Sequence, residues 1–495
     1  MLVSAGIGEG VSYCLLITDQ RCHTYTRLSS EMEKDTVTLP AKASWKIRLH
    51  ALFTDAFVDG VVGPFIPTLL REQHVSEKDI QMATSLVIFG FGILDFIGAP
   101  LCALYIDRTS NLRIPFLGGV CIMALGTTIF GFGQAIWILF LGRMVQGFAS
   151  ALLYTVSLAL LADTVPRNEV GKWLGVALSC NNIGMVLSPL FGGVIYDAAG
   201  KYAVFATTMA LIGLDMFFRL FVIVEPKQTT TKTLSRIQTP ESENTNYSGP
   251  QLSSRNGKTP NSPATRGSGI LRLIRSPRLL VALYGIFLNE CLNTTLTAVL
   301  PLFVDKTFGW STLGAGLIFL TIAIPSIAGF AFGSLSDRFG PKIVATIGMS
   351  VAGPAIILLR LVKHDGIKQV ALLCALLTIT GIAINLFLAS LSADISHVAD
   401  QESRLQKEAA GIPDDDPTDL SLYAASFSLM NTVMASATLF GPLTMGWISE
   451  KHGWGTMTAV LGGIVLSGVV PCLLFTGGRE RKDDREQLEK AGCEE

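Results

Sequence analysis

The stretch Gly333-Ser-Leu-Ser-Asp-Arg-Phe-Gly-Pro-Lys342 decides the fold, because an earlier part of the chain echoes it. The earlier copy ends on Asp107-Arg108, which also follows a long apolar run. A pair of charged residues that closes an apolar run in both halves of a chain indicates an internal repeat. The sequence therefore predicts two related halves rather than one continuous domain.

A second pair of segments supports this repeat. The run from Ser188 to Gly200 matches the run from Gly441 to Gly453, with Pro, Leu, Gly, Ile and Gly at the same places in each. Small residues at such positions let the backbones of neighbouring membrane helices approach closely. The predicted packing residues are Pro189, Gly192, Gly193, Gly441 and Pro442.

Composition places the chain in a membrane. It has 495 residues, of which 49% are hydrophobic and 16% are charged, whereas a soluble chain carries about 25% charged residues. The net charge of −1 gives no electrostatic footprint for nucleic acid. The nine cysteines form no Cys-x-x-Cys motif, so we expect no metal site, and no cofactor is predicted.

Apolar windows of about 20 residues, the length needed to cross a bilayer, predict an all-α membrane protein with twelve transmembrane helices in two six-helix pseudo-symmetric halves. The expected spans are 47–70, 81–106, 114–133, 135–161, 172–197, 201–224, 279–304, 312–335, 342–362, 368–391, 421–448 and 455–476.

The segments outside the spans are polar. We expect a cytosolic tail at 1–46, an N-terminal half at 47–224, a disordered linker at 225–278, a C-terminal half at 279–476 and a cytosolic tail at 477–495. The linker is rich in Ser, Thr, Pro and Asn, and its Lys and Arg residues place it in the cytosol. The acidic stretch from Ser392 to Leu420 is expected to be a flexible cytosolic loop.

Asp55 and Asp59 stand inside the first span, where charged groups are costly and each is a candidate functional group. They are four residues apart and share one helix face. Two carboxylates so close in a medium of low dielectric constant should not both stay ionised. We therefore expect this pair to carry a proton; a wet cavity or a helix break beside Gly60 would also accommodate Asp59.

Arg143 lies well inside the fourth span and needs a carboxylate partner. Asp59 and Asp95 are the candidates, and the pair would serve either coupling or structure. In the seventh span Glu290 and Asn293 can point the same way. They form either a substrate or proton site or a hydrogen bond between helices.

Asp215 and Arg219 are spaced i,i+4 near the end of the sixth span. This spacing predicts a local ion pair.

With these motifs in place, the chain resembles the major facilitator superfamily. Residues 333–342 look like that family's loop signature, in which an Asp and basic residues form a cytosolic latch. The run from Arg143 to Gly147 resembles its fourth-helix motif, and the run from Ser188 to Gly193 its antiporter motif. The resemblance implies a cytosolic gate made of Asp107, Arg108, Gly333, Asp337, Arg338, Gly340 and Lys342.

The segment from Leu52 to Pro67 resembles the first helix of vesicular amine transporters and their fungal drug:proton antiporter relatives, in which this Asp takes part in amine recognition or coupling. The chain departs from that group elsewhere. Phe91 stands in place of its second-helix lysine, and Asp95 is new. Asn385 and Asn431 replace its acids in the tenth and eleventh helices.

The sequence thus predicts a secondary active transporter that exports a small organic molecule, a drug or secondary metabolite, in exchange for protons. Its partners would be the substrate, protons and the lipid bilayer, with no nucleic acid, and we expect a monomer and not an enzyme. The membrane would be the plasma membrane or that of a vacuole or vesicle. Proton-coupled nutrient import and a non-transporting receptor on the same scaffold are the alternatives.

Overall fold

The computed structural model describes residues 41–108, 112–164, 170–220, 275–327, 329–410 and 420–477, and in these ranges every regular element is a helix. The predicted all-α class is therefore confirmed. The first half contains α2 (Ala41–Gly60), the 3-10 turn η1 (Gly63–Phe65), α3 (Ile66–Glu72), α4 (Ile80–Arg108), α5 (Arg113–Phe132), α6 (Ile136–Thr164) and α7 (Val170–Leu220). The second contains α9 (Pro277–Phe308), α10 (Thr312–Leu317), α11 (Leu320–Ile327), α12 (Gly329–Phe339), α13 (Pro341–Leu358), the 3-10 turn η3 (Leu359–Leu361), α14 (Ile367–Ala410), α15 (Leu420–His452), α16 (Trp454–Ser467) and α17 (Val469–Phe475).

The helices supply the twelve predicted crossings. Among the described residues, nine helical segments are long and apolar enough to span a bilayer. One of them, α7, contains two crossings, because Gly200 has φ 75° and ψ −178° and so breaks the helix. Glycine tolerates this positive φ, which other residues avoid. The series α10–α12 and the long helix α15 complete the set.

One predicted loop is helical instead. The acidic segment was expected to be flexible from Ser392 onward, but α14 continues to Ala410. Ile395, Val398 and Ala399 are buried along this extension, at the spacing of a helix face. Residues 411–419, which hold the Asp cluster, lie outside the described residues.

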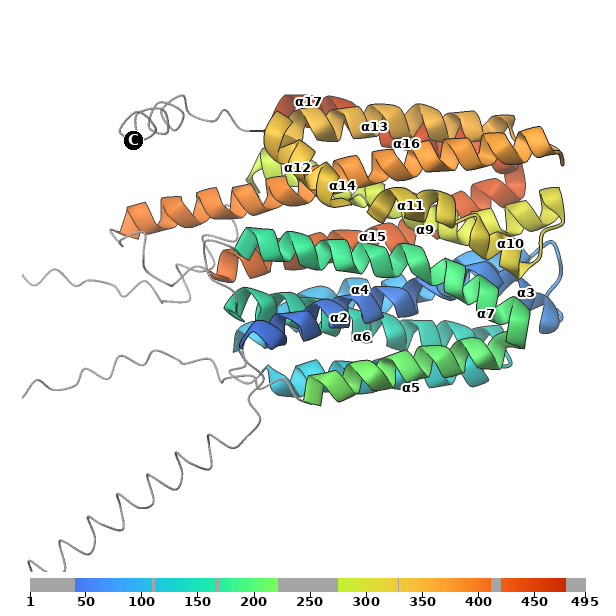
Figure 1. The fold of residues 1–495 in the computed structure, drawn as a ribbon, viewed down its shortest axis with the longest axis horizontal. Helices are drawn as coiled ribbons and strands as arrows, with labels where there is room; N and C mark the ends of the chain where they lie inside the picture. Colours follow the sequence, from blue (N-terminus) through green and yellow to red (C-terminus); the bar gives the residue numbers. More distant parts are fainter. Residues whose placement is uncertain are drawn as a thin grey trace, which may run out of the picture.

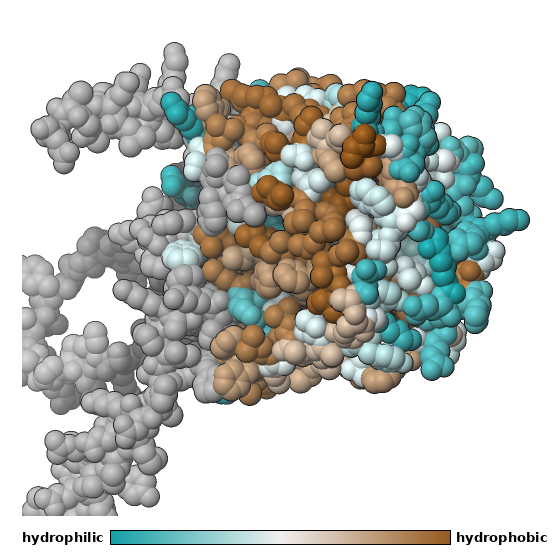
Figure 2. Space-filling model, turned by 45° about the vertical axis from the view of Figure 1, so that its right-hand side comes forward, coloured by the Kyte–Doolittle hydropathy of each residue, from teal (hydrophilic) through white to brown (hydrophobic). Residues whose placement is uncertain are grey.

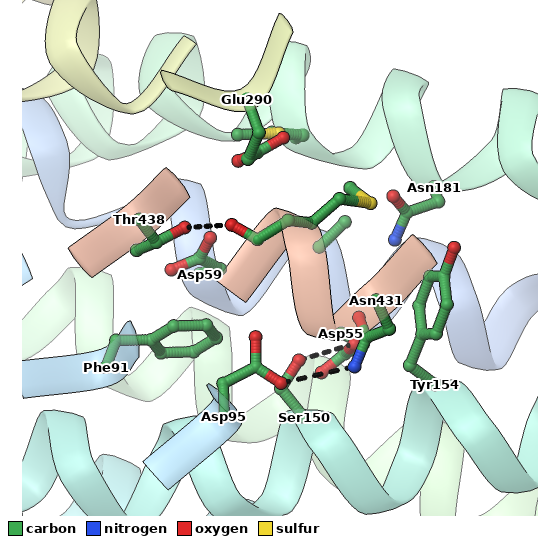
Figure 3. A pocket seen from close by; sticks show the side chains of 13 residues that line it. Asp55, Asp59, Phe91, Asp95, Ser150, Tyr154, Asn181, Glu290, Asn431 and Thr438 are labelled. Carbon is green, nitrogen blue, oxygen red and sulfur yellow. Dashed lines mark hydrogen bonds between the residues drawn. The ribbon is translucent and has the colours of Figure 1, made fainter. Parts of the chain in front are cut away.

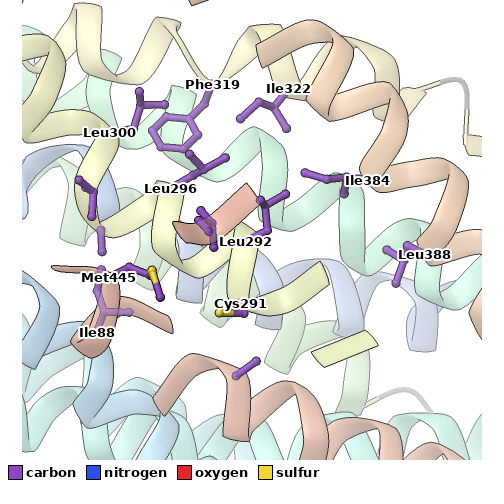
Figure 4. Packing of buried hydrophobic residues seen from close by; sticks show 14 of the residues in the cluster. Ile88, Cys291, Leu292, Leu296, Leu300, Phe319, Ile322, Ile384, Leu388 and Met445 are labelled. Atoms are coloured by element: carbon purple, nitrogen blue, oxygen red, sulfur yellow. The ribbon is translucent and has the colours of Figure 1, made fainter. Parts of the chain in front are cut away.

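Figure 1 shows the two halves side by side, with the first half below and the second above. Helix α4 packs against α15, and α7 packs against α10 and α11, so both contacts cross from one half to the other. A shared apolar core joins them, and Figure 4 shows Ile88 from the first half beside Met445 and Cys291 from the second. The 20 residues of α5 rise about 30 Å, the thickness of a bilayer core.

The hydropathy of the outer surface fits helices that cross a bilayer along the length of the bundle. Figure 2 shows a broad hydrophobic area on the visible face of the bundle, which gives way to hydrophilic residues at one end. That end carries α3 and α10, and we call it the Arg71 end (Figure 1). The opposite end, where α7 stops at Leu220 and α9 starts at Pro277, is the linker end.

The halves meet directly at the Arg71 end. Arg71 forms an ion pair with Asp305 of the second half (2.6 Å between Nη2 and Oδ2). Thr68 and Thr312 share a hydrogen bond of 3.1 Å across the same seam. A buried glutamine near the start of α4, Gln81, donates to the carbonyl of Ala298 in α9. In this conformation the Arg71 end is closed.

Candidate functional site

A small cavity lies where the two halves meet. Its volume is about 50 Å³, and Figure 3 shows its polar side chains converging from helices of both halves. Five of the predicted site residues line it: Asp55, Asp59, Asp95, Glu290 and Asn431. The structure thus brings together acids that are far apart in the sequence.

Asp55 is held against α6. It is 4% exposed, and one of its oxygens, Oδ2, accepts a hydrogen bond of 2.9 Å from Ser150. Among the described residues its other oxygen, Oδ1, is buried and has no hydrogen-bond partner. An unpaired buried oxygen is costly for a charged carboxylate, so this atom is a natural place for a proton.

Asp59 is the partner of Arg143. Its Oδ1 lies 2.6 Å from the Arg143 Nη2, which decides between the two acids considered from sequence. Arg143 also donates to Gln146 and stacks over the ring of Phe91 at 4.5 Å. Since Arg143 is only 1% exposed, its charge is compensated inside the protein by Asp59.

Asp95 reaches across the interface between the halves. The amide of Asn431 in α15 donates to its Oδ1 at 3.3 Å, and both residues are nearly fully buried. Hydrogen bonds from an amide to a carboxyl group are formed whether or not the acid is protonated, because a carboxyl oxygen accepts in both states. This contact therefore joins the halves on the floor of the cavity without fixing the charge of Asp95.

Glu290 faces the cavity from α9, but its predicted neighbour does not. Asn293 donates instead to Asn289, which in turn donates to the carbonyl of Ile384 in α14. Asn385 donates to Ser326 within the second half. These asparagines tie α9, α11 and α14 together, whereas Glu290 belongs to the central site.

Four polar residues of the cavity were missed from the sequence, and one of them is Thr438 of α15. The other three, Ser150, Tyr154 and Asn181, line it from α6 and α7. Ser150 lies two turns after Arg143 and Tyr154 one turn further, so all three share a face of α6. The helical spacing from Arg143 was the signal that could have found two of them.

The predicted cytosolic gate residues lie at the linker end. Asp107 and Arg108 close α4, and Asp337 is in the last turn of α12, but their side chains lie outside what the structure describes. Gly340 has φ 85° as it leads into α13, a conformation that favours glycine. The other predicted members are Gly333 in α12, Arg338 at its end, and Lys342 at the start of α13.

The predicted packing residues sit at close backbone contacts. A Cβ on Gly192 would lie 2.0 Å from the carbonyl oxygen of Val61, and one on Gly441 would lie 3.0 Å from that of Cys291. A Cβ on Gly193 would lie 2.7 Å from the Cα of Gly316 in the other half. Pro189 lies inside α7, three residues before Gly192, and Pro442 lies inside α15, directly after Gly441.

The cavity is strongly acidic. Four carboxyl groups line it, and one guanidinium, that of Arg143, compensates one of them. Within the described ranges, no group of three or more His, Cys, Asp or Glu residues has the arrangement of a metal site. The arrangement is suited to holding protons and to binding a positively charged group.

The cavity is too small for an organic substrate in this conformation. Sites for drug-sized ligands are typically about 300–1,000 Å³, and this one is about 50 Å³. A substrate could enter only if the two halves moved apart.

Comparisons with known proteins agree with this geometry. The profile of the Major Facilitator Superfamily matches residues 49–412. An uncharacterized MFS-type transporter of Schizosaccharomyces pombe is 26% identical over 420 residues, covering 83% of this chain and 90% of that protein. The synaptic vesicular amine transporter of Rattus norvegicus is 24% identical, covering 75% of this chain and 62% of its own length. The crystal structure of the human organic anion transporter MFSD10 (TETRAN) has the same fold, with a TM-score of 0.58, 16% identity, and coverage of 88% of this chain and 100% of that one.

Proposed function

Because the chain belongs to the Major Facilitator Superfamily, a family of membrane transporters, we propose that it exchanges a small organic molecule for protons across the membrane. The observation that carries this proposal is the central cavity, into which both halves project carboxyl groups: Asp55, Asp59 and Asp95 from the first half and Glu290 from the second. A site shared by two halves is accessible from one side at a time when the halves rock against each other.

Coupling follows from competition for the same carboxyl groups. Four acids in one buried cavity with a single cation cannot all be ionised without strong repulsion. Either protons or a bound cationic substrate would relieve this repulsion, so the two would occupy the cavity alternately. Protonation would therefore favour release of the substrate, and loss of the protons would favour its binding.

The charge of the cavity favours a substrate that carries a positive charge. With Asp59 committed to Arg143, Asp55, Asp95 and Glu290 are left to meet a cationic group. The resemblance to vesicular amine transporters linked Asp55 to amine recognition or coupling, and the cavity sets Asp95 and Glu290 beside it. The loss of acids at Asn385 and Asn431 is offset at the cavity by Asp95 and Glu290.

The direction of transport is proposed as export from the linker side. Contacts between the halves hold the Arg71 end together here, so we take separation of the halves at the linker end as the step that admits the next substrate. If the linker faces the cytosol, as its basic residues predict, the molecule would leave the cytosol for the exterior or for the lumen of a vacuole or vesicle.

Transport by the purified protein in liposomes tests the proposal with three probes: ethidium as an organic cation, fluorescein as an organic anion and glucose as a neutral nutrient. We expect a pH gradient to drive the movement of ethidium across the liposome membrane. Adding a protonophore should stop this movement. Movement of glucose would favour the nutrient carrier instead. If none of the three moves, the proposed function is wrong.

A matched pair of variants assigns the coupling. Asp55→Asn should abolish ethidium movement driven by the pH gradient, because the buried carboxyl group is lost. Asp365→Asn removes an acid in an exposed loop and should leave transport unchanged. Equal activity in both variants would remove Asp55 from the mechanism.

A further inference from the structure

A polar cluster at the linker end is not used by the cavity itself. His50 in α2 lies 3.3 Å from Asp215 in α7, measured from Nδ1 to Oδ1. The ring of His50 packs edge-on against Phe218, which fixes its orientation. Its side chain is 28% exposed, whereas that of Asp215 is 2% exposed. The pair therefore connects a buried acid to a partly exposed imidazole.

The contacts of His50 suit a group that gains and loses a proton. When Nδ1 carries a proton it can donate to Asp215. When Nδ1 is unprotonated it can accept from the hydroxyl of Thr54, which lies 3.4 Å away. Both protonation states thus have a partner at the same nitrogen.

Charge compensation does not explain the presence of His50. Asp215 already forms the ion pair predicted with Arg219, at 2.7 Å between Oδ2 and Nε. Arg219 also donates to the carbonyl of Phe116 in α5 and stacks on its ring. The buried acid and base neutralise each other, so the imidazole is an additional member of the cluster.

The cluster is electrostatically linked to the cavity. Asp55 lies five residues further along α2 than His50, and its charge is coupled through space to those of Arg219 and Asp215. Among the described residues, the buried Oδ1 of Asp55 and Nη2 of Arg219 both lack a hydrogen-bond partner. The ionisable groups around the imidazole are thus Asp215 and Arg219 from α7 and Asp55 from its own helix.

We propose that His50 and Asp215 form the port through which the central cavity exchanges protons with the solution at the linker end, an inference that rests on the proposed function. In the outward direction the O–H bond of protonated Asp55 breaks, and water passes the proton to the carboxylate of Asp215. Nδ1 of His50 takes it from Asp215, and the imidazolium releases a proton from Nε2 to the solution. One proton leaves the cavity, and Asp215 is again a carboxylate. His50 is left with its proton on Nδ1 and returns to the Nε2–H tautomer by exchanging protons with solution water at its partly exposed ring.

The test compares two modes of transport in liposomes with ethidium as the probe. The first mode is uptake driven by a pH gradient, which requires proton release. The second is exchange of labelled for unlabelled ethidium at equal pH, which does not. His50→Gln should slow the first mode by about tenfold or more, as expected for loss of a proton-transfer group, and leave the second within about twofold. His364→Gln, an exposed loop histidine, should change neither mode.

Chemical rescue separates proton transfer from structure. In His50→Ala, added imidazole should restore a large part of the driven rate, because the vacated position is partly exposed. The inference is overturned if His50→Gln behaves like the unaltered protein, or if both modes fall equally and imidazole has no effect. A protein that moves ethidium without any response to pH would instead overturn the proposed function.

Discussion

The closest backbone contact of a glycine across the halves, at Gly193, predicts the outcome of adding one methyl group. In Gly193→Ala the new Cβ would lie 2.6 Å from the carbonyl oxygen of Thr312 and 2.7 Å from the Cα of Gly316. Both neighbours are backbone atoms of the other half, so no side chain can rotate away. The methyl group fits only if the halves separate at the Arg71 end.

The size of the effect follows from the cost of overpacking. Forcing an extra carbon into a well-packed contact costs about 1–3 kcal/mol. This cost is paid in the conformation closed at the Arg71 end and is absent when that end opens. The ratio of closed to open molecules should therefore fall by roughly 5- to 150-fold.

Gly213→Ala is the matched control. Gly213 lies in the second crossing of α7, beyond the break at Gly200, and a Cβ on it would meet no atom within 4 Å. Both substitutions raise helix propensity by about 1 kcal/mol, so this contribution cancels in the comparison. Only the contact between the halves differs.

Distances between spin labels at the Arg71 end would measure the shift. Lys78 and Lys451 lie on opposite halves beside a cavity of about 610 Å³ at this end. Labels at these positions in a cysteine-free protein should report a longer distance in Gly193→Ala than in Gly213→Ala. Identical distance distributions in the two variants, with both proteins equally stable, would refute closure by this contact.

Three further predictions concern the ion pairs. Arg71→Gln removes the partly exposed pair with Asp305; at about 0–1 kcal/mol, its loss should open the Arg71 end by up to roughly fivefold in the same label assay. The hydrogen bond from Arg71 lowers the pKa of Glu77 from its ordinary value of 4.5, so their pair stabilises the first half above that pH and is lost as the pH falls through the lowered pKa; the difference in thermal stability between the unaltered protein and Glu77→Gln should therefore shrink only below pH 4.5. Asp59→Asn leaves Arg143 buried and unpaired, which should destabilise the protein by about 3–5 kcal/mol; thermal unfolding in detergent should show a smaller loss when Arg143→Gln is added, and additive losses would contradict the pairing.

Much of the architecture follows from the sequence because the bilayer restricts the choices. Spans of apolar residues, a repeat with matched glycines and a glycine at the break in α7 are all local signals. The end of α14 was misjudged because its extension is polar on one side. Its other side is buried by tertiary contacts, and Asp394 there pairs with Arg278 of α9, a contact that no local pattern reveals.

The sequence was enough to predict which acids belong to the site. It was not enough to predict which residue each acid contacts. Asp55, Asp59, Asp95 and Glu290 stand out because charge inside an apolar span must face the interior. The choice of Asp59 as partner of Arg143 depends on how α2 crosses α6. The interface bond from Asn431 to Asp95 depends on how the halves dock. Both contacts are set by tertiary packing and have no local signal in the sequence.

The pairing of Asp59 with Arg143 also determines how the membrane voltage acts on the protein. A buried pair with no net charge moves no charge when the halves rock. The electrical work therefore depends on Asp55, Asp95 and Glu290 and on what they hold, at about 2.3 kcal/mol per elementary charge and 100 mV. Exchange of one proton for one monovalent cation would be electrically silent, whereas two protons per cation would make transport sensitive to voltage.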